Sequence, residues 1–343
     1  MSLSKIAYCF IIIIGSVTTL IYAKPLLIPF ILALIIWFLI KELKVTMKKT
    51  TYIFNKLPDT LLTLIASFLI FIILGMIVKM ISTNIQMLSQ NLTVYESNID
   101  STILSINNTF EIDLLAHLKG FTEGMNFSKI FKMILNSLSE LFGNAFMIFL
   151  YVVFLILEEA VFNHKIKEIY HNREQFIHAT DLLAKIDKSI ANYLTLKTIV
   201  SLITGILSYL ALLFMKVDAP IFWAFIIFIL NYIPTVGSLI ATLFPSIFAL
   251  LQFGDFATSV YVLALVGGVQ VIVGNIIEPK LMGSSLNISS LVVILSLSFW
   301  GTIWGITGMI LSVPITVVMI ILFAEFPQTK FIAIILSEKG KLS

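Results

Sequence analysis

Two long apolar stretches in the C-terminal half of the chain contain the residues best suited to bind a ligand. The first, residues 221–251, is interrupted by Asn231-Tyr-Ile-Pro-Thr-Val-Gly-Ser238. The second, residues 289–323, is interrupted by Phe299-Trp-Gly-Thr-Ile-Trp-Gly305, Gly308 and Ser312-Val-Pro314. Proline lacks a backbone N–H and glycine weakens a helix, so both interruptions free polar backbone groups. The interruptions therefore predict helix ends that offer amides and carbonyls to a substrate or an ion.

The candidate substrate or ion pathway combines these helix-breaking residues with the polar residues beside them. We expect the prolines and glycines to break helices, the asparagines and exposed backbone to bind, and Glu278 to fix a hairpin entrance or sense an ion. The full set is Asn231, Pro234, Thr235, Gly237, Asn275, Glu278, Pro279, Gly283, Gly301, Gly305, Gly308 and Pro314. Two alternatives stay open. The polar side chains can hydrogen-bond an adjacent helix, and Gly301 and Gly305, a GxxxG pattern, can pack against a neighbouring helix.

The charged residues limit the chemistry further, because nearly all of them lie near the ends of predicted spans. A buried proton relay is weakly supported, although Glu278 could titrate or pair with Lys280, and Asp255 is a second candidate carboxylate. The chain has no HExxH motif and no phosphate-binding glycine loop, and it has one cysteine. We therefore predict no enzyme, no metal site and no cofactor apart from an optional coupling cation, H⁺ or Na⁺.

Composition assigns the chain to the membrane. Of its 343 residues 59% are hydrophobic and 12% are charged, and the mean hydropathy is +1.04. Average soluble domains carry about 25% charged residues, so lipid must be the solvent for much of this chain. The net charge of +3 comes from basic residues in loops, which gives no nucleic-acid signal.

Hydropathy predicts an all-α polytopic membrane protein with about six full spans and two broken re-entrant hairpins in the C-terminal half. The spans lie near residues 6–22, 25–40, 60–81, 141–157, 195–215 and 256–277, and the hairpins at 221–251 and 289–323. Lysines crowd the loop after the second span, and short basic loops mark the cytoplasmic side. Both termini are therefore predicted to be cytoplasmic, and residues 82–140 to form an extracytoplasmic helical insertion.

We predict five domains or segments. They are residues 1–81 (spans 1–3), 82–140 (the insertion), 141–194 (span 4 and a cytoplasmic helical linker), 195–325 (a transport unit) and 326–343 (a cytoplasmic tail). A stripe of apolar residues at helical spacing runs from Ile81 to Ile106. It indicates either a helix folded on its own neighbours or a contact between subunits.

The two C-terminal units follow one plan, a full span, a short turn with proline and a broken double-length segment. With the predicted topology they point in opposite directions, and inverted repeats with discontinuous helices are typical of secondary transporters. The alternative is two long tilted helices with proline kinks.

Three segments resemble the AI-2E transporter family, also called UPF0118 permeases. They are Asn231–Gly237, Glu278–Gly283 and Phe299–Pro314. The resemblance implies transport across a bacterial inner membrane, with exporters of the quorum-sensing signal autoinducer-2 as namesakes. Some similar proteins are described as sodium(lithium)/proton antiporters. The resemblance also implies homo-oligomers, pentamers among them, and elevator-like movement of the hairpin region.

The sequence-based hypothesis is a secondary transporter that exports a small polar solute, such as an autoinducer-2-like signal, by alternating access of a hairpin-containing unit. The neutral polar residues of the broken segments favour an uncharged or polyhydroxylated solute. The alternatives are a Na⁺(Li⁺)/H⁺ antiporter, which needs an essential carboxylate, and a structural membrane protein that transports nothing.

Overall fold

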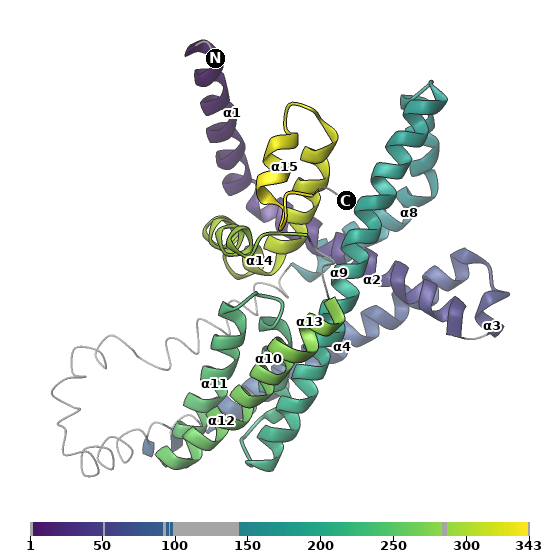
Figure 1. Ribbon diagram of the computed structural model, residues 1–343. Coiled ribbons are helices and arrows are strands. Elements are labelled where there is room, and N and C mark those ends of the chain that lie inside the picture. The colour runs from purple at the N-terminus through teal and green to yellow at the C-terminus, as the bar shows by residue number, and fades with distance from the viewer. Residues whose placement is uncertain are drawn as a thin grey trace. The chain divides into compact units, whose positions relative to one another are not determined.

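The computed structural model describes residues 3–50, 52–91, 94–95, 97–98, 144–282 and 287–341, and these residues fold as helices joined by turns, without a strand. The elements are shown in Figure 1. In chain order they are α1 (Leu3–Tyr22), α2 (Lys24–Thr50), α3 (Tyr52–Asn55), α4 (Asp59–Gln90), α8 (Ala145–Ile169), α9 (Arg173–Phe214), α10 (Pro220–Leu230), α11 (Val236–Phe253), α12 (Phe256–Ile272), a π-helical turn (Val273–Ile277), α13 (Glu278–Met282), α14 (Ser290–Glu325) and α15 (Lys330–Leu336).

Six of the described helical segments are long and apolar enough to cross a membrane. They are Lys24–Thr50, Asp59–Leu88, Arg173–Phe214, Val236–Phe253, Phe256–Leu281 and Ser290–Glu325. A multi-pass all-helical membrane protein is therefore confirmed. The set differs from the predicted six spans, since it omits the predicted spans at 6–22 and 141–157 and includes α11 and α14, which were expected to be parts of hairpins.

The chain divides into two compact units. Unit 1 comprises Met1–Ile70, Asn144–Thr195 and Ser284–Ser343, and unit 2 comprises Phe71–Gly143 and Leu196–Gly283. The helices α4 and α9 each contribute to both units. The five predicted domains, with their assignment of a transport unit, remain a prediction.

Unit 2 has a core built around the pair α11 and α12. These helices pack on each other, and the Ser259 hydroxyl donates to the Ser246 carbonyl oxygen at 2.8 Å. Trp223 of α10 packs against Phe248 of α11, with ring centroids 5.0 Å apart. Aromatic pairs at this distance add to the stability that apolar burial supplies.

The apolar stripe after the third predicted span contributes to this same core. Ile81, Leu88 and Tyr95 are almost fully buried among residues of α10, α11 and α12. The Tyr95 hydroxyl also donates to Asp218 at 2.8 Å, and burial, with the nearby Asp218 carboxylate, raises the pKa of Tyr95 to about 12. This part of the stripe therefore folds on its own chain. Residues 99–143, which hold the rest of the stripe and most of the predicted insertion, lie outside the described residues.

Unit 1 is organised by α2, α8 and α14. The helix α2 packs along α8, and α14 packs against α15, α1 and α2. Trp300 and Trp304 lie in a core cluster with Ile28, and the Trp304 indole donates to the Leu20 carbonyl oxygen at 3.0 Å. Both tryptophans therefore act as packing residues inside unit 1.

Asp255 begins α12 and has a structural role. Its carboxylate accepts hydrogen bonds from the backbone N–H groups of Ala257 and Thr258, at 3.3 and 2.8 Å, and from the Thr258 hydroxyl at 2.6 Å. This is an N-cap, which satisfies backbone donors that the first turn of a helix leaves free. The bonds from Thr258 hold the pKa of Asp255 below its ordinary value.

Replacing Asp255 with alanine should lower the free energy of unfolding by about 1 kcal/mol at pH 7. Because the folded-state pKa is depressed, this stabilisation is complete above the unfolded-state pKa and is lost as the pH falls through the folded-state value. Denaturant unfolding of the purified protein at pH 7 and in the acid range measures both effects. Asp255→Asn, which keeps a capping oxygen, should lose only the pH dependence. Equal stability of Asp255→Ala and the natural protein at pH 7 would contradict the cap.

Candidate substrate pathway at the broken helices

The first predicted interruption is a helix–turn–helix in unit 2. The helix α10 ends at Leu230 and α11 begins at Val236, with residues 231–235 as a turn between them. Thr235 has φ 57° and ψ −58°, and the Val236 N–H donates to the Pro234 carbonyl oxygen at 2.6 Å. This is a γ-turn with positive φ at a residue other than glycine, a rare and strained conformation. Such strain persists where the surrounding structure enforces it, often at functional sites.

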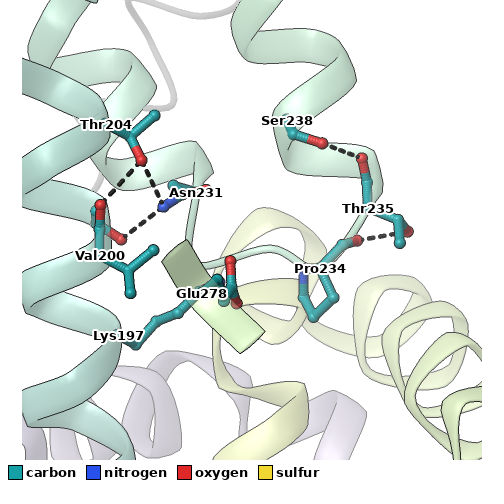
Figure 2. A network of polar contacts seen from close by, with 9 residues as sticks. Lys197, Val200, Thr204, Asn231, Pro234, Thr235, Ser238 and Glu278 are labelled. Carbon is teal, nitrogen blue, oxygen red and sulfur yellow. Dashed lines mark hydrogen bonds and ion pairs between the residues drawn. The ribbon is translucent and has the colours of Figure 1, made fainter. Parts of the chain in front are cut away.

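Asn231, at the start of this turn, is buried and bonded to α9. Its side-chain amide donates to the Ser201 hydroxyl at 3.2 Å and to the Thr204 hydroxyl at 3.4 Å. Thr204 in turn donates to the Val200 carbonyl oxygen at 2.9 Å. Figure 2 shows Asn231 facing α9, whereas Thr235 and Ser238 lie on the far side of the turn. Asn231 thus makes the contact with an adjacent helix that sequence reasoning gave as the alternative to ligand binding.

Glu278 forms an ion pair with Lys197 of α9, with Nζ and Oε1 2.5 Å apart. The structure thus pairs Glu278 with Lys197 and not with Lys280, the partner that the sequence left open. Residues two apart on a helix point to different faces. Only 6% of the Lys197 side chain is exposed, against 26% for Glu278. Sequence reasoning missed Lys197. The available signal was a lysine two residues inside an apolar span that was predicted to begin near Thr195.

A π-helical turn at Val273–Ile277 holds Asn275 and leads directly into α13. Pro279 explains this turn, because proline cannot donate the N–H that an α-helix would pair with the carbonyl of Asn275. A π-turn accommodates the missing bond within a continuous helix. Asn275 and Pro279 are exposed in the single chain, and Gly283 lies outside the described residues.

The second predicted interruption is a sharp break at Gly305 in unit 1. Gly305 has φ 64° and ψ −144° inside α14, so α14 consists of two helical arms. The expectation that Pro314 breaks the helix was wrong. The second arm continues through Pro314 to Glu325, with Pro314 buried in unit 1. Of the two glycines in the GxxxG pattern, Gly305 is itself the break and a Cβ there would meet no atom within 4 Å. A Cβ on Gly301 would lie 2.9 Å from the Met309 side chain of the second arm, so Gly301 does pack closely against a neighbouring helical arm.

One glycine follows each break and allows the two helical arms to approach closely. A Cβ on Gly237 would lie 1.9 Å from the Leu230 carbonyl oxygen, and a Cβ on Gly308 would lie 1.9 Å from the Trp300 carbonyl oxygen. Neither position has room for a side chain. The sequence paired the two broken segments because their elements follow the same order. Both segments also use a glycine after the break to bring their helical arms close together.

The structure divides the predicted pathway between the two units. Unit 2 holds the α10–α11 turn, the π-turn and the Lys197–Glu278 ion pair, and unit 1 holds the glycines and Pro314 of α14. Within the described ranges, no cluster of three or more His, Cys, Asp or Glu residues could hold a metal ion.

Alanine at Gly305 tests the second break. A Cβ at this position would meet no atom within 4 Å, so only the backbone conformation opposes the substitution. Conformations of this kind cost side-chain-bearing residues about 1–3 kcal/mol. Gly305→Ala should therefore lower the free energy of unfolding by about that amount. Gly301→Ala should cost less, because its Cβ meets only side-chain atoms of the flexible Met309, Cε and Cγ among them. Unchanged stability in Gly305→Ala would contradict the positive φ.

The apolar helices define a multi-pass membrane protein, and interrupted helices of this kind are typical of secondary transporters. The chain belongs to the AI-2E family of transporters, whose sequence pattern matches residues 10–328. This confirms the resemblance found in the sequence. The family consists of transport proteins rather than enzymes, and membership in it confirms the prediction that this chain is not an enzyme.

Several relatives match nearly the whole length of this chain. The AI-2 transport protein TqsA of Escherichia coli (strain K12) is 29% identical over 327 residues, covering 93% of this chain and 92% of TqsA. A protein of Haemophilus influenzae is 30% identical over 92% of this chain and 91% of its own length. A protein of Borreliella burgdorferi is 27% identical over 99% of this chain and 92% of its own length. The latter two carry only a general transport-protein name.

Proposed function

We propose that this protein is a secondary transporter that exports a small polar solute, such as an autoinducer-2-like signal. The polar residues at the α10–α11 break form part of the solute's path. The observation that supports this most is the group of neutral polar side chains, Asn231, Ser201 and Thr204, beside a strained turn, because a solute hydroxyl can take the place of their long mutual bonds. The likeness to TqsA over nearly the full length favours a solute of the same kind.

The chemistry of the turn suits an uncharged, hydroxyl-rich solute. Asn231, Ser201 and Thr204 are neutral and exchange hydrogen bonds at 3.2 and 3.4 Å, which are long for such contacts. A solute hydroxyl can replace bonds of this length without leaving a buried polar group unpaired. The strained Thr235 γ-turn gives the segment a conformation that can relax when the solute enters or leaves.

The proposed setting is the bacterial inner membrane, with both termini cytoplasmic. In it the α10–α11 segment and the two arms of α14 act as re-entrant hairpins of opposite orientation, residues 82–140 lie outside the cytoplasm, and transport proceeds by alternating access. The chains assemble as homo-oligomers, for which a pentamer is our working hypothesis. The break at residues 231–235 and the break at Gly305 support this arrangement, because discontinuous helices are typical of secondary transporters.

A Na⁺(Li⁺)/H⁺ antiporter is the second candidate, and the Lys197–Glu278 ion pair favours it. A carboxylate whose partner is a buried ammonium can exchange that partner for a proton or a metal cation, and ionisable groups in membrane spans often mark ion paths. In that case the coupling cation would be H⁺ or Na⁺, with Glu278 as its ligand.

Flux into proteoliposomes distinguishes these functions. The purified protein is assayed with a labelled autoinducer-2-like solute and, separately, with sodium, lithium and pH gradients. Asn231→Leu should lower solute flux at least tenfold, because it removes bonds to both hydroxyls. Asn84→Leu is the matched control, since among the described residues the Asn84 amide donates to the Met80 carbonyl oxygen of its own helix.

Each outcome selects a function. Solute flux that is lost in Asn231→Leu and kept in Asn84→Leu supports the exporter. Cation-driven proton movement that is lost in Glu278→Gln supports the antiporter instead. If the correctly inserted natural protein moves neither solute nor protons, the exporter and the antiporter both fail and the structural alternative stands.

A further inference from the structure

A cavity of about 450 Å³ lies within unit 1, between α2, α8 and α9. It is separate from the broken helices. Its walls are mainly aliphatic and aromatic, with Leu34 and Phe38 from α2, Leu155 and Phe162 from α8, and Ile186 from α9. Pockets of about 300–1,000 Å³ with apolar walls and a few polar groups are typical ligand sites.

The polar groups of this cavity are Trp37, Lys41, Glu158, Glu159, Thr180 and Asp187. Two of the three carboxylates are neutralised by neighbouring lysines. Lys41 pairs with Asp187 at 2.5 Å, and Lys165 pairs with Glu158. Glu159 accepts a hydrogen bond from the Trp37 indole at 2.8 Å, and it has no ion-pair partner in the described part of the chain. The cavity thus offers one uncompensated carboxylate beside aromatic rings.

This arrangement has the chemistry of an ammonium site. A carboxylate supplies charge-assisted hydrogen bonds to an N–H donor, and aromatic faces attract a cation. The Lys41 ammonium already lies 5.2 Å from the centre of the Trp37 ring, so this ring accepts a cation within the protein itself.

The position of the cavity along the helices indicates where the ammonium comes from. Each of the three helices changes from apolar to charged residues at this cavity: α2 after Ile40, α8 after Leu157, and α9, in the reverse direction, after Lys188. In a membrane protein such changes mark the level of the lipid head groups, where tryptophan is also enriched. The apolar walls at Leu34 and Leu155 then lie on the hydrocarbon side.

We propose that this cavity binds a phospholipid whose head group carries a primary ammonium, as in phosphatidylethanolamine. The ammonium bonds to Glu159 beside Trp37, and one acyl chain lies against Leu34 and Leu155. The lipid holds α2, α8 and α9 together at the membrane surface. Charge complementarity supports this occupant, because an ammonium compensates the one carboxylate that the surrounding lysines leave unpaired.

Native mass spectrometry of the full-length protein in detergent tests the proposal. The protein is titrated with phospholipids of identical acyl chains that carry ethanolamine, choline or glycerol head groups. We expect the ethanolamine lipid to bind about tenfold more tightly than the glycerol lipid. The choline lipid should bind with intermediate affinity, because its trimethylated nitrogen keeps the charge but donates no hydrogen bond.

Glu159→Gln should abolish this preference while keeping an acceptor for the Trp37 indole, so the fold is retained. Glu168→Gln is the matched control, because Glu168 is an exposed carboxylate on the same helix outside the cavity lining. Equal binding of the three lipids overturns the proposal, as does a preference that survives in Glu159→Gln or is also lost in Glu168→Gln. Displacement of the lipid by an equal concentration of free ethanolamine would make the ligand a soluble amine and would also overturn it.

Discussion

Replacing Gly237 with alanine is expected to unfold the α10–α11 turn. The added Cβ would lie 1.9 Å from the Leu230 carbonyl oxygen, 2.9 Å from its carbon and 3.0 Å from the Ile233 Cβ. These atoms belong to the backbone or to the start of a side chain, so none can move aside alone. Overpacking of this kind costs up to about 3 kcal/mol, and occasionally more. We expect a loss of at least that size in the free energy of unfolding, together with loss of transport.

Gly308→Ala should have an effect of the same size in unit 1. The Cβ would lie 1.9 Å from the Trp300 carbonyl oxygen and 2.9 Å from the Trp304 Cβ. The two variants therefore test whether the two broken segments depend on the same close approach of their arms.

Gly268→Ala is the control for both variants. Gly268 lies within α12, where an added Cβ would meet no atom within 4 Å. Alanine is the better helix former, so this variant should gain up to about 1 kcal/mol. Thermal unfolding in detergent, followed by fluorescence, measures all three variants. A Gly237→Ala protein as stable as Gly268→Ala would contradict the observed packing of α10 against α11.

Removing either member of the Lys197–Glu278 pair should be costly, and the two costs should differ. Glu278→Gln leaves the Lys197 ammonium, whose side chain is only 6% exposed, without its carboxylate. Breaking a buried ion pair by removing one partner costs about 3–5 kcal/mol. Lys197→Met leaves Glu278, whose side chain is 26% exposed and can turn to water, so its cost should be smaller, about 1–2 kcal/mol.

The double variant Lys197→Met with Glu278→Gln separates stability from function. Replacing both members of a buried pair is often close to neutral for stability. We expect the double variant to recover most of the lost unfolding free energy in a double-mutant cycle. If the pair takes part in transport, solute or ion flux stays low in the double variant although its stability is restored. Additive losses in the cycle would show that the two side chains do not interact.

Much of the local structure of the candidate site was predictable from the residues themselves. Pro234 and Gly237 mark the turn between α10 and α11, and Gly305 marks the break in α14, because proline and glycine act on the backbone where they occur. Pro314 has the same chemistry, yet α14 continues through it. Packing around a buried proline can re-satisfy the freed backbone groups, and sequence alone does not show whether it does.

The sequence by itself determined the environment of this protein and the places where its helices stop. An apolar content of 59% requires lipid as the solvent, and helix breaks follow from residues adjacent in the chain. Only the tertiary structure decided which distant groups meet. Lys197 forms an ion pair with Glu278, which is 81 residues away in the sequence, and the Trp37 indole donates a hydrogen bond to Glu159, 122 residues away. The physical reason is that backbone preferences are local, whereas the partner of a buried charge depends on which helix faces pack together.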